Sequence, residues 1–303
     1  MNKTVHVLVV LLCSYLVTSV STIHAESKKV RYPAVAGAFY PYNKERLTKI
    51  IDGYLDNVGE PKIKGAVVGV VAPHAGYAYS GQIAAYAFKP LQGKSYDTVV
   101  ILGPNHTVYG FSDISVYKEG MFKTPLGMAH IDEDFTKKII DSDPEKFVYE
   151  PDLHRKEHAI EVEIPFLQHV LKGDFKIVPV VMGDYSRETV EKLAHAIMKA
   201  SVGKKVLIVA SCDLSHDKDY KTACAMDKKA VDTIAGLDLD ALESYGKNRK
   251  TEMCGYGPVM ILMYIAKSEG VSKGTVMKYA NSGDVTGDKS GRIVGYASIV
   301  FSK

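Results

Sequence analysis

Three apolar runs in this chain have the composition of buried strands, and a loop carrying a histidine follows each of them. An open parallel sheet gathers the carboxyl ends of its strands at one edge, and ligands bind there. Histidines far apart in the sequence could therefore meet in space. The pattern predicts a sheet with a metal or acid–base site at one edge. The runs with their histidines are 66–72 with His74, 97–102 with His106 and 205–211 with His216.

Strand-like runs alternate with helical patterns along most of the chain, which predicts an α/β fold. No internal repeat, low-complexity tract or linker interrupts the alternation. We therefore expect a single domain with a largely parallel central sheet flanked by helices. Further strands are expected at 176–182, 274–280 and 292–300. Helices are expected at 44–55, 81–89, 132–141, about 156–171, 187–200, 223–235, 239–246 and 258–269.

The N-terminal segment has the features of a targeting signal. Lys3 is the only formal charge in residues 1–25, and residues 7–17 form a mostly apolar run. That run is shorter than the roughly 20 apolar residues that a membrane-spanning helix needs. We expect a cleaved signal peptide ending at Ala25, a mature α/β domain over 26–303, and export to the periplasm.

The charge of the chain is near neutral, at +3, and basic residues are mixed with acidic ones rather than grouped. This argues against a nucleic acid as the main partner. No second long apolar segment is present, so we expect no membrane span in the mature chain. A small molecule or a peptide remains as the partner to be identified.

Three cysteines remain after the expected cleavage: Cys212, Cys224 and Cys254. An odd number cannot all pair, so at least one thiol stays free or binds metal. Burial as small apolar residues and a Cys212–Cys254 disulfide are both open alternatives. Cys254 lies just before an expected helix that carries Pro258 in its first turn. A helix N-terminus lowers the pKa of a thiol and favours the metal-binding thiolate.

Two histidines follow tight, glycine- and proline-containing strand exits. His74 lies in Pro-His-Ala-Gly-Tyr and His106 in Gly-Pro-Asn-His. A hydrogen-bonded structural histidine is the usual explanation for one such residue, but the repeated arrangement favours a site. Neutral imidazole suits zinc, copper, iron and nickel, so the histidines do not choose the metal.

The loop after the third strand carries Asp213 and His216. An aspartate beside a histidine can orient the ring and raise its basicity, as in an acid–base pair. Helix capping by Asp213 or Ser215 is the alternative.

His154, Glu157 and His158 match the H-x-x-E-H pattern of zinc hydrolases, in which two histidines share a helical face. The short pattern also suits a solvated, charged helix start. His158 and Glu161 would share a face at i, i+3 and could point into one cleft. Residues 281–288 are rich in turn formers and are expected to be a surface loop between two strands.

Several of these motifs, in this order, resemble the Memo family, whose bacterial members are called AmmeMemoRadiSam system protein B. The resemblance runs from residue 33 to the C-terminus, essentially the whole expected mature chain. It implies a fold similar to that of class III extradiol dioxygenases, which are non-haem iron enzymes. The resembling segments are 33–41, 72–77, 102–106, 157–161, 211–216, 254–255, 281–288 and 292–297.

The resemblance also implies a site. Carried over by position, His74, His106 and Cys254 are metal ligands, with cysteine in place of the carboxylate of the dioxygenases. His216, with Asp213 beside it, resembles the acid–base histidine. We therefore expect one ion, Fe(II), Cu or Zn, in a dioxygenase-like redox enzyme. A non-catalytic metal- or peptide-binding module and a zinc hydrolase built on His154 are the alternatives.

The family name suggests a pathway link to a radical-SAM protein. Most relatives in the family lack a signal peptide, whereas this chain carries the features of one. Export would separate it from a cytoplasmic partner. An oxidising compartment would also disfavour thiolate-bound Fe(II) and favour copper or zinc.

Overall fold

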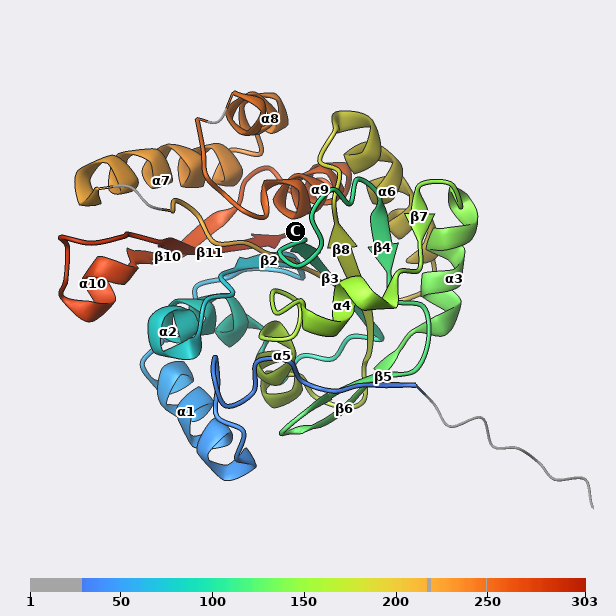
Figure 1. Cartoon of the computed structure of the whole chain (residues 1–303), viewed down its shortest axis with the longest axis horizontal. Helices are drawn as coiled ribbons and strands as arrows, with labels where there is room; N and C mark the ends of the chain where they lie inside the picture. Colours follow the sequence, from blue (N-terminus) through green and yellow to red (C-terminus); the bar gives the residue numbers. More distant parts are fainter. Residues whose placement is uncertain (1–28, 217–218, 249) are drawn as a thin grey trace, which may run out of the picture.

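The computed structural model describes residues 29–216, 219–248 and 250–303. Its centre is a run of five parallel strands, which confirms the expected α/β class (Figure 1). Two antiparallel strands extend the sheet beyond β2. The parallel strands, in sheet order, are β6 (Gly127–Ile131), β8 (Lys176–Met182), β3 (Thr98–Pro104), β9 (Val206–Ser211) and β2 (Val67–Ala72). The strands beyond β2 are β11 (Gly295–Ser302) and β10 (Thr275–Asn281).

Short strands that the sequence analysis did not predict complete the sheet on the side of β6 and β8. β5 (Met121–Thr124) forms a hairpin with β6, and β1 (Val30–Arg31) pairs with β5. β4 (Ile114–Val116) pairs with β8, and β7 (Phe147–Val148) with β4. Runs this short carry too little alternation to be recognised as strands.

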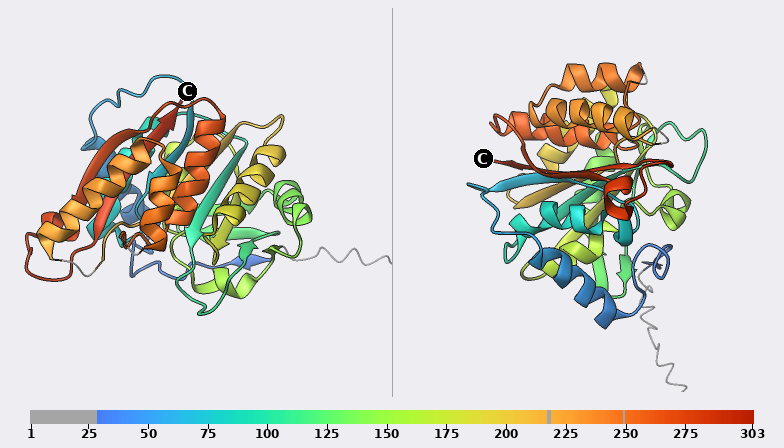
Figure 2. Two further views of the ribbon diagram at one scale, coloured as in Figure 1. Left: turned by 90° about the horizontal axis from the view of Figure 1, so that it is seen from above. Right: turned by 90° about the vertical axis from the view of Figure 1, so that its left-hand side faces the viewer.

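Helices cover both faces of the sheet, giving three layers (Figure 2). In the right-hand view of Figure 2, α7–α9 lie above the sheet and α1 and α2 below it. β2 and β3 are buried along their whole length, as expected for strands covered on both faces. One face is covered by α1 (Lys44–Asp56), α2 (Tyr77–Phe88) and α5 (Glu163–Val170). The other is covered by α3 (Glu133–Ser142), α6 (Arg187–Ala200), α7 (Tyr220–Ala235), α8 (Leu239–Lys247) and α9 (Tyr256–Ser268).

Side-chain caps fix where several helices begin. The side chains of the N-cap residues accept hydrogen bonds from backbone N–H groups of the first turn, which have no partner inside the helix. α9 lacks such a cap and starts after Gly255, with Pro258 in its first turn as expected. The capping residues are Asn43 for α1, Asp132 for α3, Ser186 for α6, Asp219 for α7 and Asp238 for α8.

The expected single helix at about 156–171 is wrong. The chain instead forms α4 (Pro151–Lys156), an irregular turn at 157–162, and α5. The Glu157 carboxylate accepts hydrogen bonds from the backbone N–H groups of His158 and Ala159, at 2.8 and 2.9 Å. A side chain that engages nearby backbone N–H groups in this way competes with the helix.

The expected surface loop at 281–288 joins β10 to β11, but it contains a short helix, α10 (Ser282–Thr286). Within the described ranges, no helix is both long and apolar enough to cross a membrane. The expected signal peptide at 1–25 lies outside the described residues, so it stays a prediction.

Candidate metal centre

Three neighbouring strands of the sheet deliver polar side chains to the same edge. β3, β9 and β2 are adjacent and parallel, so the loops after them lie together (Figure 1). His74 follows β2 and His106 follows β3, while Asp213 and His216 follow β9. Cys254 reaches the same place from the loop before α9, which packs on β9 and β2.

His74, His106 and Cys254 each offer one ligand atom, and these atoms lie within 4.8 Å of one another. The Cys254 Sγ is 3.2 Å from the His74 Nε2. The two imidazole rings meet edge to face, with centroids 5.2 Å apart. Two imidazoles and a thiol at this spacing are a donor set that suits a single transition-metal ion.

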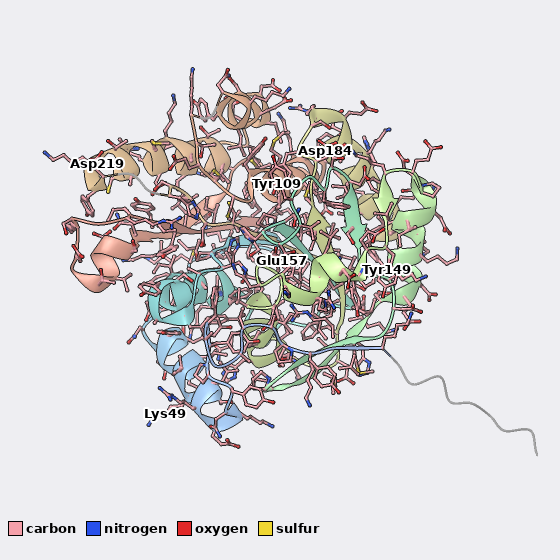
Figure 3. The ribbon with its side chains drawn as sticks, viewed as in Figure 1. Lys49, Tyr109, Tyr149, Glu157, Asp184 and Asp219 are labelled. Atoms are coloured by element: carbon pink, nitrogen blue, oxygen red, sulfur yellow. The ribbon has the colours of Figure 1, made fainter. Side chains whose placement is uncertain are left out.

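In His74 and His106, the ring nitrogen that points away from the cluster, Nδ1, lies within hydrogen-bonding distance of a side-chain oxygen. The His74 Nδ1 lies 2.8 Å from the Ser211 Oγ, and the Ser211 hydroxyl lies 2.6 Å from the Glu163 Oε1. The His106 Nδ1 lies 2.9 Å from the Glu157 Oε1. Such partners set the tautomer and leave Nε2 free to act as a ligand. Glu157 lies near the middle of the view in Figure 3.

Burial controls the thiol. It raises the pKa of Cys254 to about 12, and a hydrogen bond with Cys212 acts in the same direction. The pKa lowering expected from the helix N-terminus is therefore wrong for the metal-free protein, because desolvation of the thiolate outweighs it. A metal ion would have to displace the thiol proton, so binding would release a proton.

His106 behaves in the opposite way. Burial acts to lower its pKa, but hydrogen bonds with Cys254 and Glu157 outweigh burial and raise the pKa to about 10. Burial acts to raise the pKa of Glu157, but its hydrogen bond with His106 outweighs burial and lowers the pKa to about 2. The metal-free site therefore favours a charged His106–Glu157 pair, and a metal ion would also have to displace a proton from the His106 Nε2 before that nitrogen could act as a ligand.

A third imidazole completes the cluster. The His158 ring stacks on His106 at 4.8 Å and meets His74 edge to face at 5.6 Å. With Glu157 and His106 it forms a second group that could hold an ion. The expectation that His158 and Glu161 point into one cleft is wrong. The Glu161 carboxylate instead faces Arg31, the Tyr40 hydroxyl and the backbone of the N-terminal segment.

Asp213 and His216 lie beside the cluster. The Asp213 Oδ1 accepts a hydrogen bond from the His74 backbone N–H at 2.9 Å, and Asp219 rather than Asp213 caps α7. The His216 Nδ1 lies 3.0 Å from the Leu214 carbonyl oxygen. Both residues line an open cavity of about 460 Å³ together with His158. Its other walls include Phe39, Tyr79, Arg292, Val294 and Tyr296.

The zinc-hydrolase arrangement is not formed among the described residues. His154 belongs to α4, which ends before His158, so the two imidazoles do not share a helical face. The His154 ring is buried, lies 3.0 Å from the Ser115 Oγ and packs against Tyr117. The break after Lys156 separates the two histidines that this alternative needs.

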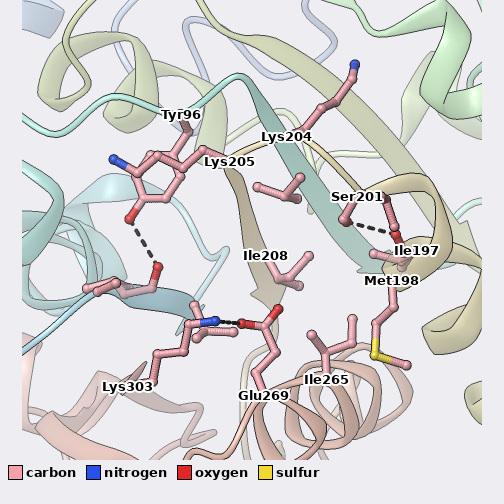
Figure 4. A pocket seen from close by; sticks show the side chains of 15 residues that line it. Tyr96, Ile197, Met198, Ser201, Lys204, Lys205, Ile208, Ile265, Glu269 and Lys303 are labelled. Atoms are coloured by element: carbon pink, nitrogen blue, oxygen red, sulfur yellow. Dashed lines mark hydrogen bonds and ion pairs between the residues drawn. The ribbon is translucent and has the colours of Figure 1, made fainter.

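A second cavity, of about 340 Å³, lies at the opposite edge of the sheet (Figure 4). Its polar groups are already engaged: Lys303 pairs with Glu269, and the Tyr96 hydroxyl donates to the Val67 carbonyl. It contains no histidine or cysteine. The candidate metal chemistry therefore lies at the carboxyl ends of the strands.

Comparison with known proteins assigns the chain to a family. Residues 31–300 match the family described as Memo-like protein. The chain belongs to the Memo family. A MEMO1 family protein of Methanosarcina mazei is 39% identical over 278 residues, and one of Methanobrevibacter smithii is 40% identical over 285. One of Sulfolobus acidocaldarius is 39% identical over 291 residues. Each alignment covers 90% of this chain and 99% of the relative.

The Memo match includes every residue of the cluster and of the cavity beside it. It also includes two residues whose contacts with the histidines the sequence did not reveal. Ser211 contacts the His74 Nδ1, and Glu157 contacts the His106 Nδ1. Ser211 ends β9 next to Cys212, and this position at the sheet edge was the available signal for it. Glu157 belongs to the H-x-x-E-H pattern and to the Memo-like segment 157–161, and neither pattern indicates its contact with His106.

Proposed function

We propose that this Memo family protein is a non-haem, metal-dependent redox enzyme of the dioxygenase-like class. The observation that supports it is the convergence of His74, His106 and Cys254, with both outer imidazole nitrogens already held by oxygens. That arrangement presents three ligand atoms in one place and fixes the tautomers that ligation requires.

The donor set fits a transition metal: imidazoles suit zinc, copper or iron, and a thiolate adds a soft anionic ligand. A bound ion would supply open coordination positions for O₂ or a small organic substrate. The chain itself would orient the imidazoles through Ser211 and Glu157. His216 and Asp213 would hold or move a proton at the wall of the cavity.

The first test is metal content. Protein purified from its native compartment is analysed for elements, and anomalous scattering locates the ion. We expect one ion at the cluster. His74→Ala and Cys254→Ser should each weaken metal binding strongly, whereas Cys224→Ser, a cysteine outside the cluster, should not. Unchanged metal affinity in both His74→Ala and Cys254→Ser would show that this cluster does not bind the metal.

The second test is chemistry. Metal-loaded protein is incubated with O₂ and catechol-like compounds while oxygen consumption and the oxidation state of the metal are followed. Turnover that is lost in His216→Ala, with the ion retained, supports the proposed roles. Loaded protein that neither consumes oxygen nor changes metal oxidation state contradicts an enzymatic role.

A non-catalytic metal- or peptide-binding module is the second candidate. It is favoured by the way the loop after β9 uses its polar groups. An Asp213 oxygen binds the His74 backbone, and the His216 Nδ1 faces the carbonyl oxygens of Leu214 and Glu252. Tight metal or peptide binding without turnover, in the same assays, would select this candidate.

Export to the periplasm is part of the proposal, supported by Lys3 and the apolar run at 7–17. Copper or zinc is then favoured over Fe(II), and a cytoplasmic radical-SAM protein is disfavoured as a direct partner. Cell fractionation with N-terminal sequencing tests this: a mature chain starting at Glu26 in the periplasm is expected. Full-length protein in the cytoplasm would contradict it.

A further inference from the structure

Two sulfur atoms meet at the candidate metal centre, although only one belongs to the cluster of ligand atoms. The Sγ atoms of Cys212 and Cys254 contact the same atom, the carbonyl oxygen of Asp213, at 3.1 and 3.6 Å. In addition to burial, Cys212 contributes to the raised pKa of the Cys254 thiol, as a neighbouring sulfur does. No disulfide joins these two cysteines in the structure.

The two loops that carry these cysteines pack backbone against backbone. A Cβ atom on Gly255 would lie 2.4 Å from the Ser211 carbonyl oxygen and 2.9 Å from the Cys212 Cβ. Any side chain at position 255 would push the loops apart. Glycine therefore permits the close approach of the main chains that a disulfide requires, with Cα atoms about 4.4–6.8 Å apart.

We propose that Cys212 and Cys254 are a redox-active pair whose reversible disulfide removes Cys254 from the metal centre. The consequence for metal rests on the proposed function, but the formation of the disulfide does not. Cys224 is outside the pair: its sulfur accepts from the Asn281 side chain at 3.4 Å.

The difference in solvent exposure between the two cysteines indicates which of them is oxidised first. Cys254 as a residue is partly exposed, whereas Cys212 is fully buried, so an oxidant from solvent meets Cys254 first. The burial that raises the pKa of the Cys254 thiol makes this first step slow, because the thiolate is the reactive form. Hydrogen peroxide transfers one oxygen to the Cys254 sulfur as its O–O bond breaks, giving a sulfenic acid and one water. The Cys212 sulfur then displaces that oxygen. The S–S bond forms, the S–O bond breaks, and both thiol protons leave in the two waters.

The disulfide would change what the centre offers an ion. A thiolate is the form of cysteine that binds metal, and a disulfide sulfur carries no such charge. Only the two imidazoles, His74 and His106, would remain of the donor set. We therefore expect oxidation to lower metal affinity and reduction to restore it.

The test uses the mature chain, first metal-free and then titrated with Zn²⁺, which is itself redox-inert. Protein is treated with hydrogen peroxide, free thiols are alkylated, and cysteine peptides are mapped by mass spectrometry. We expect a Cys212–Cys254 cross-link that a phosphine reductant reverses, and a loss of Zn²⁺ affinity of about tenfold or more that reduction restores. Over-oxidised Cys254 beside an unmodified Cys212 would overturn the proposal.

Matched variants separate the pair from the ligand. Cys212→Ser and Cys212→Ala should bind Zn²⁺ when reduced. Excess peroxide should then oxidise their Cys254 beyond the sulfenic acid to a sulfinic acid, which the phosphine does not reverse, so that Zn²⁺ binding is lost irreversibly. Cys224→Ser should behave like the wild type. Cys254 that resists over-oxidation in the Cys212 variants as well as it does in the wild type would contradict the pair. Reduced wild type that binds no Zn²⁺ would contradict the proposed function alone, because the mass map still reports the disulfide.

Discussion

At the scale of single residues, the centre depends on what holds the back of each imidazole. Ser211 links His74 to Glu163, whose side chain is buried. Burial raises the pKa of Glu163 well above its usual value, the Ser211 hydrogen bond acts against this, and the charge of Asp213 adds to it. One hydroxyl therefore connects a ligand candidate to a carboxyl group that favours its neutral form.

Replacing Ser211 tests this connection. Ser211→Ala removes the oxygen that faces the His74 Nδ1, so we expect metal affinity to fall about 10- to 100-fold. Isothermal titration with Zn²⁺ measures it. Ser201→Ala is the control, because that hydroxyl bonds the Ile197 carbonyl at the opposite edge of the sheet. Equal affinities in the two variants would show that Ser211 does not orient His74.

His154 gives a pH prediction at the same scale. Burial, and then the charge of Arg31, lower the pKa of His154 from 6.5 to about 3. Between these values the unfolded chain binds the proton and the folded chain does not, so stability falls as pH falls. The slope is about 1.4 kcal/mol per pH unit for this one group.

We expect His154→Gln to lose part of the acid sensitivity of the wild type between pH 6.5 and about 4, in denaturant unfolding followed at several pH values. Exposed His130 provides the control. A His154→Gln protein whose stability falls with acid as steeply as that of His130→Gln would contradict the buried neutral state.

At the scale of elements, the turn at 157–162 ties the site to the N-terminal segment. The Arg31 guanidinium donates to the backbone carbonyls of His154 and Glu157 and pairs with the Glu161 carboxylate. That carboxylate also accepts from the Ala34 backbone. Because the expected helix is broken here, Glu157 contacts His106 and Glu161 contacts Arg31 of β1.

Arg31→Ala should be strongly destabilising, by about 3–5 kcal/mol, because it leaves the Glu161 charge buried without its partner. Lys29→Ala is the matched control: Lys29 and Glu119 form an exposed pair in the same region, so about 1 kcal/mol or less is expected. Urea unfolding of both variants measures the difference. Similar losses in the two proteins would mean that the buried pair is not what secures β1.

At the scale of the whole molecule, the sheet places the candidate site at one edge and leaves the other edge without metal-capable clusters in the described ranges. Any ion bound at the cluster would join β2, β3 and the start of α9, which come from distant parts of the chain. Binding should therefore stabilise the whole domain rather than one loop.

Zn²⁺ at about 100 times its dissociation constant should raise the free energy of unfolding by about 2.7 kcal/mol, because only the folded chain assembles the donors. Thermal melts with and without Zn²⁺ measure this. His74→Ala should show no such shift, while Cys224→Ser should match the wild type. A shift that persists in His74→Ala would place the stabilising ion elsewhere.

Much of the fold was predictable because its signals are local. The buried runs that became β2, β3, β8 and β9 are continuous apolar segments, and most helices show a regular apolar period. The turn at 157–162 was not predictable, since its helical pattern was overruled by hydrogen bonds between Glu157 and nearby backbone groups. The short strands at the β1 edge carried no local signal.

The α/β class, the family and the strand ends that carry His74 and His106 all follow from the amino-acid sequence alone. The family resemblance already implied that Cys254 joins these histidines, and the structure places the three ligand atoms together. The contact of Glu157 with His106 and the closeness of Cys212 to Cys254 became visible only in the folded chain. Periodicity depends on near neighbours in the sequence, whereas a site depends on which strands are adjacent in the sheet. The same reason applies to the Cys254 thiol, where burial by distant residues overrides the helix N-terminus next to it.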